Sequence, residues 1–423
     1  VVQGMTKIFS DWITNTGVDG FRIDTAKHVN PKFWKSFLPA MRAVAAKQGK
    51  SYFPMWGEVY DSDALNTSYW VKNARFNEVL DFPLQERMLN YVRTASTDGL
   101  AGLFANDDQY TTASSNADQL VTFLGNHDMG RVGSFIANSG GSPSEQLAKD
   151  EMAHALLFTV RGNPAVYYGD EFGLEGGNDK AARQDLFPTQ VAQWKQEARI
   201  GGNPIGSGSS FDTTNPLQDV IKSLTSLRTQ NAAFAQGPQV IRYARDGIFA
   251  FSRFDTKTNR EYVCAFNATS SDASVKFRVA STGSDWNAIR GHGDLLPGTT
   301  LATLNLPAGK WAVFKSLDTL PNATNPAVTL SKVTLDPMNS TQYKVMARVS
   351  GTLFAQVEFF IKTGKSKWMS VGSDQSPAFS TGLYRVFPQR ALFVKGKKYS
   401  VKAVVRGVGG KTKTSTVATV LAR

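Results

Sequence analysis

The stretch that decides the fold is Gly17-Val18-Asp19-Gly20-Phe21-Arg22-Ile23-Asp24-Thr25-Ala26-Lys27-His28. Its apolar run, Val18–Ile23, is typical of a strand, and it ends at the carboxylate of Asp24. The next segment, 31–47, carries apolar residues at helical spacing and predicts a helix. An acid between a strand and a helix is either a capping residue or part of an active site at the carboxyl edge of a sheet. This stretch alone leaves both interpretations open.

The composition indicates a globular protein of more than one domain. A chain of 423 residues with 41% hydrophobic and 19% charged residues is too long for one core. No apolar run is long enough to cross a bilayer. Cys264 is the only cysteine, which excludes an internal disulfide. The sequence begins with Val1 and shows no signal peptide, so we expect a fragment or a processed product.

The net charge of +12 is concentrated at one end of the chain. Residues 318–423 hold 16 Lys and Arg but 4 Asp and Glu, whereas the other residues hold 31 of each kind. A basic domain can bind nucleic acid or an anionic surface. These lysines are scattered through strand-like alternations, which favours a solvated face and predicts no nucleic-acid partner.

Residues 1–235 alternate short apolar runs with helical patterns, which predicts a parallel sheet covered by helices. Beyond 18–23, strands are expected at 52–57, 76–82, 120–124 and 165–168, and helices at 2–15, 145–160 and 217–230. Asp24 and Glu58 are 34 residues apart, and Glu58 and Asp128 are 70 apart. These separations match one and two repeats of a (β/α)8 TIM barrel, so the three acids are expected on one face.

The expected fold class is therefore α/β, with about strands 4–8 of a TIM barrel followed by two all-β sandwiches. Only five strands are expected where a barrel needs eight, and the fragment alone is expected to be poorly soluble or inactive. The pattern changes to period two near Val240. We divide the chain into the barrel (1–235), an antiparallel β-sandwich (236–317) and a basic immunoglobulin- or fibronectin III-like sandwich (318–423).

The three acids suit glycoside cleavage. A retaining glycosidase needs a carboxylate nucleophile and a second, protonated carboxyl group across the scissile bond. Arg22 lies two residues before Asp24, on the same face of the strand, where it can pair with that acid. Metal-assisted chemistry is a competing interpretation, but the four His form no HExxH cluster. Neither a P-loop, a dinucleotide GxGxxG nor a GxSxG elbow is present.

Four ordered motifs resemble those of the α-amylase superfamily, glycoside hydrolase family 13, and are closest to those of α-amylases. They are 20–28 (GFRIDTAKH), 57–59 (GEV), 123–128 (FLGNHD) and 163–171 (NPAVYYGDE). The resemblance covers about residues 1–320 and excludes the last domain. The family's first signature region and the excursion that supplies most calcium ligands have no counterpart in this sequence.

The resemblance implies a role for each matching residue. Asp24 would be the nucleophile, Glu58 the acid and base, and Asp128 the transition-state stabiliser. The substrate-binding residues would be Arg22, Lys27, His28 and His127. Calcium would be the cofactor, with the His28 backbone carbonyl as one ligand.

The implied activity is endo-acting hydrolysis of α-1,4-glucans such as starch, with retention, by a secreted protein. A transglycosylase, a maltogenic or α-1,6-acting hydrolase, and a non-catalytic barrel scaffold remain alternatives. The substrate would be an α-glucan, and the last domain is a candidate for binding polysaccharide or a cell surface.

Other residues have two interpretations each. Asp170 and Glu171 could face the substrate or stabilise a loop, and no catalytic part is predicted for Arg183. Trp368 and Tyr384 could stack on sugar, but aromatic residues in a sandwich are more often core.

Overall fold

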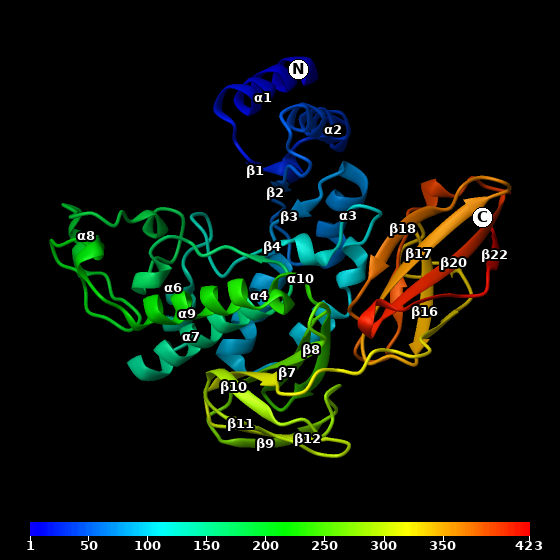
Figure 1. Cartoon of the computed structure of the whole chain (residues 1–423). Helices are drawn as coiled ribbons and strands as arrows, with labels where there is room; N and C mark the ends of the chain where they lie inside the picture. Colours follow the sequence, from blue (N-terminus) through cyan, green and yellow to red (C-terminus); the bar gives the residue numbers. More distant parts are fainter.

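The computed structural model describes residues 1–423 and contains a helical region with short parallel strands, followed by two antiparallel β regions. In Figure 1 the helical region occupies the centre, the first β region lies below it, and the second lies to its right. The structure therefore has the fold class expected from the sequence, an α/β region followed by two β domains.

Five short parallel strands carry the site: β1 (Phe21–Ile23), β2 (Met55–Gly57), β3 (Glu78–Val79), β4 (Val121–Thr122) and β5 (Asn163–Pro164). Strands β1, β2 and β3 pair in this order, and β4 pairs with β5. A parallel bridge between Leu80 and Val121 connects the two groups. All five strands consequently end on one side, as the repeat spacing predicted.

The helices cover these strands: α1 (Val2–Thr16), α2 (Pro31–Lys47), α3 (Ala64–Ala74), α4 (Phe82–Thr94), α5 (Asp98–Phe104), α6 (Val132–Ala137), α7 (Pro143–Thr159), α8 (Ala192–Gln196), α9 (Pro216–Gln230) and α10 (Ala232–Gln236). Helix α2 has the predicted bounds because Pro31 occupies its first turn and the Asn30 side chain caps it, accepting from the Lys32 amide at 2.9 Å. Its buried residues, among them Phe37 and Met41, join a core of 49 residues.

The strand expected at 165–168 is wrong: the pairing residues are Asn163 and Pro164, and the residues after them form a loop. The buried guanidinium of Arg131 lies over the rings of Tyr167 and Tyr168, 4.4 and 5.0 Å from their centres. It also donates to the Tyr168 carbonyl at 2.5 Å. These contacts hold the aromatic residues in a loop, although their β propensity favours a strand.

The middle region is a sandwich of two antiparallel sheets. One sheet contains β6 (Gln239–Arg245), β7 (Ile248–Asp255), β8 (Arg260–Asn267), β10 (Trp286–Gly291) and β13 (Trp311–Ser316). The other contains β9 (Ala273–Phe277), β11 (Asp294–Leu296) and β12 (Ala302–Leu306). Phe277, Leu304 and Phe314 lie in the core between them.

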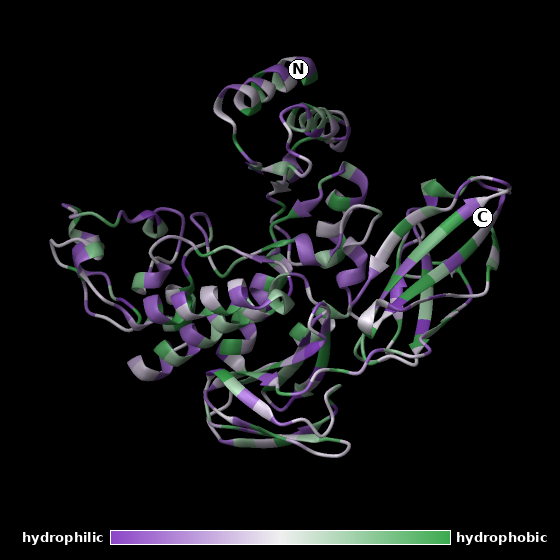
Figure 2. Ribbon diagram, viewed as in Figure 1, coloured by the Kyte–Doolittle hydropathy of each residue, from purple (hydrophilic) through white to green (hydrophobic).

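The last region is a second sandwich. Its sheets contain β14 (Ala327–Leu330), β15 (Thr334–Leu335), β16 (Tyr343–Ser350) and β19 (Tyr384–Val386) on one side, and β17 (Ala355–Thr363), β18 (Met369–Asp374), β20 (Lys398–Gly407), β21 (Thr412–Thr414) and β22 (Ala418–Leu421) on the other. Hydrophobic and hydrophilic residues alternate along the long strands, as Figure 2 shows.

Of the two interpretations of Trp368 and Tyr384, the favoured one, core packing, holds for Tyr384. The Tyr384 side chain is buried in the core, as expected for an aromatic residue of a sandwich. Trp368 is half-buried, and the ammonium groups of Lys362 and Lys402 lie 4.8 and 4.6 Å from its ring centre. The two aromatic rings therefore form no common platform.

The last sandwich docks on the helical region through buried polar groups. Arg385 donates to Asp108 at 2.5 Å, and Asp108 belongs to a 3-10 helix, η2 (Asp107–Tyr110). Gln375 donates to Asp118 at 2.5 Å. The two regions, which the middle sandwich separates along the chain, are thus joined by polar and charged contacts. None of the helices combines the length and the apolar composition that crossing a membrane requires.

Candidate active site

Asp24 and Glu58 lie side by side at the carboxyl ends of two paired strands. Ile23 of β1 is in register with Gly57 of β2, so the next residue of each strand leaves the sheet at the same edge. The Glu58 amide donates to the Ile23 carbonyl at 2.8 Å, which extends this pairing to the acid itself. Gly57 is required there because a Cβ atom would lie 2.9 Å from the Phe76 ring.

Arg22 connects the two carboxylates. Its guanidinium donates to Asp24 and lies 3.4 Å from the Glu58 carboxylate through its other terminal nitrogen. The second Glu58 oxygen accepts from the Thr25 amide at 2.9 Å. The Asp24 side chain is 62% exposed and that of Glu58 13%, so one acid is open to an incoming molecule and the other is held in place.

Asp128 approaches from a turn after β4. The Asn126 side chain accepts from the amides of Asp128 and Met129, both at 2.9 Å, and the Asn126–Gly130 bridge closes the turn. Such a side-chain-to-backbone bond fixes the direction of the turn. It therefore orients the Asp128 carboxylate relative to the other two acids.

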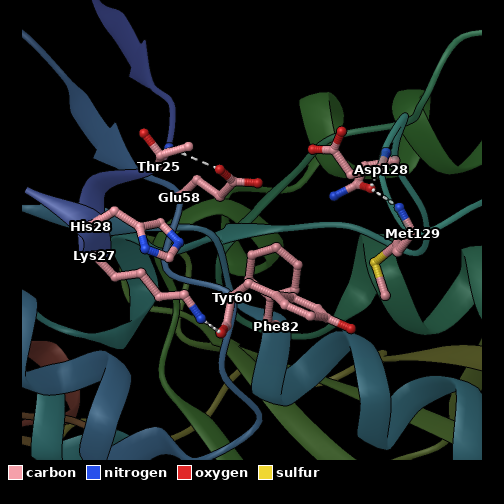
Figure 3. A pocket seen from close by; sticks show the side chains of 9 residues that line it. Thr25, Lys27, His28, Glu58, Tyr60, Phe82, Asp128 and Met129 are labelled. Carbon is pink, nitrogen blue, oxygen red and sulfur yellow. Dashed lines mark hydrogen bonds between the residues drawn. The ribbon is translucent and has the colours of Figure 1, made fainter. Parts of the chain in front are cut away.

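A pocket of about 290 Å³ lies between Glu58 and Asp128, and the predicted site residues Asp24, Arg22 and His127 are not among those that line it. It is lined by Thr25, Lys27, His28, Glu58, Tyr60, Phe82, Asn126, Asp128 and Met129. Figure 3 shows Glu58 and Asp128 reaching toward the pocket from opposite sides, with Lys27 and His28 next to Glu58. Two acids on opposite walls of one polar pocket can act together on a single bound group.

The predicted pair Lys27 and His28 lines the same pocket. The Lys27 ammonium donates to the Tyr60 carbonyl at 2.5 Å and lies 5.7 Å from the centre of its ring. Sequence reasoning missed Tyr60 and Phe82, although Tyr60 stands two residues beyond Glu58 and so shares its side of an extended segment. The rings of Tyr60 and Phe82 meet edge to face at 4.8 Å and form an apolar wall.

Two side chains approach the Asp128 carboxylate. The His127 Nε2 atom lies 3.2 Å from one carboxylate oxygen, and the Arg183 guanidinium donates to the other at 3.2 Å. Arg183 also pairs with Asp179 at 2.6 Å. The sequence predicted no catalytic role for Arg183. It lies 55 residues beyond Asp128, and a separation of that length does not indicate a contact.

Comparison with known proteins decides the family. The family described as "Alpha amylase, catalytic domain" matches residues 1–237. The chain belongs to the α-amylase family, glycoside hydrolase family 13.

Curated relatives agree with this assignment. An α-amylase of Streptomyces lividans is 39% identical over 387 residues, which are 89% of this chain and 42% of that protein. A cyclomaltodextrin glucanotransferase of Bacillus sp. (strain 38-2) is 30% identical over 246 residues, which are 57% of this chain and 29% of that protein. The chain thus spans less than half the length of these relatives.

The solved structure of an Anoxybacillus α-amylase has the same fold. It matches with a TM-score of 0.60 and 22% identity, covering 76% of this chain and 63% of that chain.

In this family member Asp170 stabilises a loop. Its side chain is buried and accepts from Arg131 at 3.1 Å, beneath the Tyr167 and Tyr168 loop. Burial raises the pKa of Asp170 to about 7, and the Arg131 charge offsets part of that increase. Glu171 accepts from the Gly169 amide at 2.7 Å. Of the two interpretations of these acids, loop stabilisation is the one their contacts support.

Trp34 fixes the loop that carries Lys27 and His28. Its indole donates to the Ala26 carbonyl at 3.0 Å from a buried position on α2. A buried hydrogen bond of this kind holds the segment between Asp24 and α2 in one conformation. Trp34 therefore positions the pocket wall in addition to packing in the core.

Calcium was expected from the family resemblance. No group of three His, Cys, Asp or Glu side chains comes together in a way that could hold a metal ion. Calcium takes six to eight oxygen ligands, so the His28 carbonyl alone does not form a site. The residues of this chain do not fit the ion by themselves, and calcium stays a prediction.

Proposed function

We propose that this chain carries the catalytic site of a retaining, endo-acting hydrolase of α-1,4-glucans such as starch. The observation that supports the proposal is the Arg22 guanidinium between Asp24 and Glu58, with Asp128 on the pocket that Glu58 also lines. A retaining enzyme needs two carboxyl groups close enough to act on one glycosidic bond. One guanidinium that contacts both acids meets this requirement.

In the proposed reaction the exposed Asp24 carboxylate attacks the anomeric carbon and forms a glycosyl-enzyme. Glu58 gives a proton to the leaving oxygen and then removes one from the water that hydrolyses the intermediate. Asp128 binds hydroxyl groups of the same sugar, and these bonds strengthen as positive charge develops on the ring. Lys27 and His28, beside Glu58, contact the leaving-group side.

The test is release of reducing sugar from soluble starch by the full-length gene product and by its Asp24→Asn variant. Loss of the nucleophile is expected to lower the rate by at least about 10³-fold. Asp19→Asn is the matched control, because Asp19 is exposed, lies before the start of β1 rather than at its carboxyl end, and pairs with Lys50. Equal rates for the Asp24 variant and the unchanged protein would refute the assignment.

A glucan-modifying activity is the second candidate, and the 30% identical glucanotransferase is the observation that favours it. A transglycosylase would convert maltotriose into longer chains, a maltogenic enzyme would release mainly maltose, and an α-1,6-acting hydrolase would cut pullulan at its branch-type linkages. Product chromatography on starch, pullulan and maltotriose separates these activities from internal α-1,4 cleavage. A non-catalytic scaffold would not need Glu58 and Asp128 on one pocket together with Asp24 on the same arginine as Glu58.

The five parallel strands belong, in this proposal, to the later part of a (β/α)8 barrel. Strand β1 pairs on one side only, with β2. Helix α1 carries Met5, Ile8 and Trp12 along one face, and all three are exposed. Apolar residues three and four apart normally pack against a neighbouring element, so further barrel strands and helices would cover this face.

We also propose that the protein is secreted and requires calcium. Both proposals rest on the family resemblance, and none of the contacts described above bears on them. The last sandwich is proposed to bind polysaccharide or a cell surface. Its binding properties are independent of the catalytic residues and need their own test.

A further inference from the structure

A groove of about 680 Å³ lies between the helical region and the last sandwich. Its basic residues from the helical side are Lys35 of α2, Lys72 of α3 and Arg75 after α3, and those from the sandwich are Arg390, Lys395 and Arg423. No acidic side chain lines it. Such a surface attracts anions, because nothing within the groove cancels its charge.

Apart from Lys72, whose ammonium donates to Gln109 and Gln342, several of these cations remain available to a ligand. Lys35, Arg75 and Lys395 are exposed, and their side chains take part in no ion pair or hydrogen bond of the structure. Arg390 donates one Nε–H, at 3.0 Å, to the Arg423 carbonyl and keeps its terminal nitrogens free. By contrast, Arg385, which also lies between the two regions, is paired with Asp108 and is not available to a ligand.

The two walls of the groove are held in fixed positions. Gln389 of the sandwich donates to the Lys72 carbonyl at 3.0 Å and to the Asn73 side chain at 2.7 Å. The Lys72 ammonium in turn donates to Gln342 at 2.9 Å. Because these bonds join the walls directly, the cations are arranged before a ligand arrives, and less entropy is lost on binding.

We propose that this groove binds a phosphate group carried on an α-glucan chain. Guanidinium groups form paired hydrogen bonds to phosphate oxygens, and ammonium groups add point charges. A phosphate monoester carries nearly two negative charges at neutral pH, so it suits several converging cations better than a single carboxylate does. The glucan part of the ligand rests on the proposed function, and the phosphate part rests on the groove alone.

A single-stranded nucleic acid fits the groove less well. Proteins that bind such strands stack bases on exposed aromatic rings. Phe393 is the one aromatic residue in the lining, and its side chain is buried. The hydroxyl and amide groups of Asn73, Ser340 and Thr341 instead offer hydrogen bonds to sugar and phosphate oxygens.

The test compares phosphate-bearing amylopectin with the same amylopectin after phosphatase treatment, by affinity electrophoresis of the full-length protein. We expect at least tenfold tighter binding to the phosphorylated glucan at low salt, with the difference shrinking as sodium chloride is added. The variant Arg75→Gln/Lys395→Gln should lose that difference. The control Lys365→Gln/Lys413→Gln changes charge equally at exposed positions of the same chain outside the groove and should keep it.

Equal affinity for the two glucans, or an unchanged preference in the Arg75/Lys395 variant, would overturn the proposal. Tighter binding to poly(glycerol phosphate) or to single-stranded DNA than to the phosphorylated glucan would also overturn it. Starch hydrolysis is measured in parallel on the phosphatase-treated glucan. Failure of the catalytic proposal appears as missing hydrolysis, whereas failure of this one appears as missing phosphate preference, so the two are distinguishable.

Discussion

At the scale of residues, three positioning contacts organise the pocket: Arg22 between two acids, the Thr25 amide on Glu58, and Arg183 on Asp128. The sequence motif predicted Arg22 because it stands on the same strand face as Asp24. It could not predict Arg183, which comes from a loop far along the chain. Arg183 is therefore the residue whose contribution most needs measurement.

Arg183→Gln is expected to lower kcat/KM on starch by roughly tenfold, which corresponds to about 1.4 kcal/mol of transition-state stabilisation. Its guanidinium contacts the Asp128 carboxylate, so kcat should carry most of the loss. Thermal unfolding should be unchanged, since the side chain is half exposed. Steady-state kinetics of the variant give the split between kcat and KM.

Lys180→Gln, an exposed neighbour in the same loop, is the control. Arg183→Lys should recover part of the activity, because an ammonium can still donate to Asp128. If Arg183→Gln and Lys180→Gln have the same kinetics, Arg183 does not position Asp128.

At the scale of elements, the short strand β3 carries a buried acid. Glu78 accepts from the Tyr52 hydroxyl, and burial raises its pKa to about 7, with the Arg42 charge offsetting part of the rise. The folded protein then binds this proton more tightly than the unfolded chain does. The resulting stabilisation is fully present below the ordinary pKa near 4.5 and is lost as the pH rises through about 7.

Glu78→Gln should therefore reduce the pH dependence of stability. Between pH 5 and pH 8 the free energy of unfolding of the unchanged protein is expected to fall by roughly 1–3 kcal/mol more than that of the variant. Chemical denaturation at both pH values measures this difference. Glu86→Gln, at an exposed ion pair with Arg87, should leave the pH dependence as it is; a Glu78 variant with the same slope as the unchanged protein would contradict the prediction.

At the scale of the whole molecule, the ion pair between Arg385 and Asp108 holds the last sandwich against the helical region. Burial raises the pKa of Asp108 to about 6, and the charges of Arg385 and Lys72 act against that rise. Removing one partner of a buried ion pair leaves the other charge uncompensated. The contact is thus expected to control how firmly the two regions are joined.

Arg385→Gln should lower the free energy of unfolding by roughly 3 kcal/mol and make the linker before β14 easier to cut with protease. Thermal unfolding and limited proteolysis measure the two effects. Arg406→Gln changes an exposed residue of β20 and is the control. Unchanged unfolding and proteolysis in the Arg385 variant would show that this ion pair does not hold the two regions together.

The sequence by itself predicted the elements and the order of the acids. Helix α2 has the predicted bounds because proline, asparagine and apolar spacing act within a few residues of each other. Asp24, Glu58 and Asp128 were predicted on one face because parallel strands repeat at a constant length. Local and periodic signals of this kind can be read without coordinates.

Only the tertiary structure decided which distant groups meet. Arg131 keeps the expected strand at 165–168 in a loop, Arg183 reaches Asp128, and Lys35 and Arg75 face Arg390 and Lys395 across one groove. The basic excess of the last domain was expected on a solvated face, and only the structure shows that exposed Lys395 and half-buried Arg390 of that excess line one groove with residues of the helical region. Contacts between remote segments depend on how whole elements pack, and no spacing along the chain records that packing.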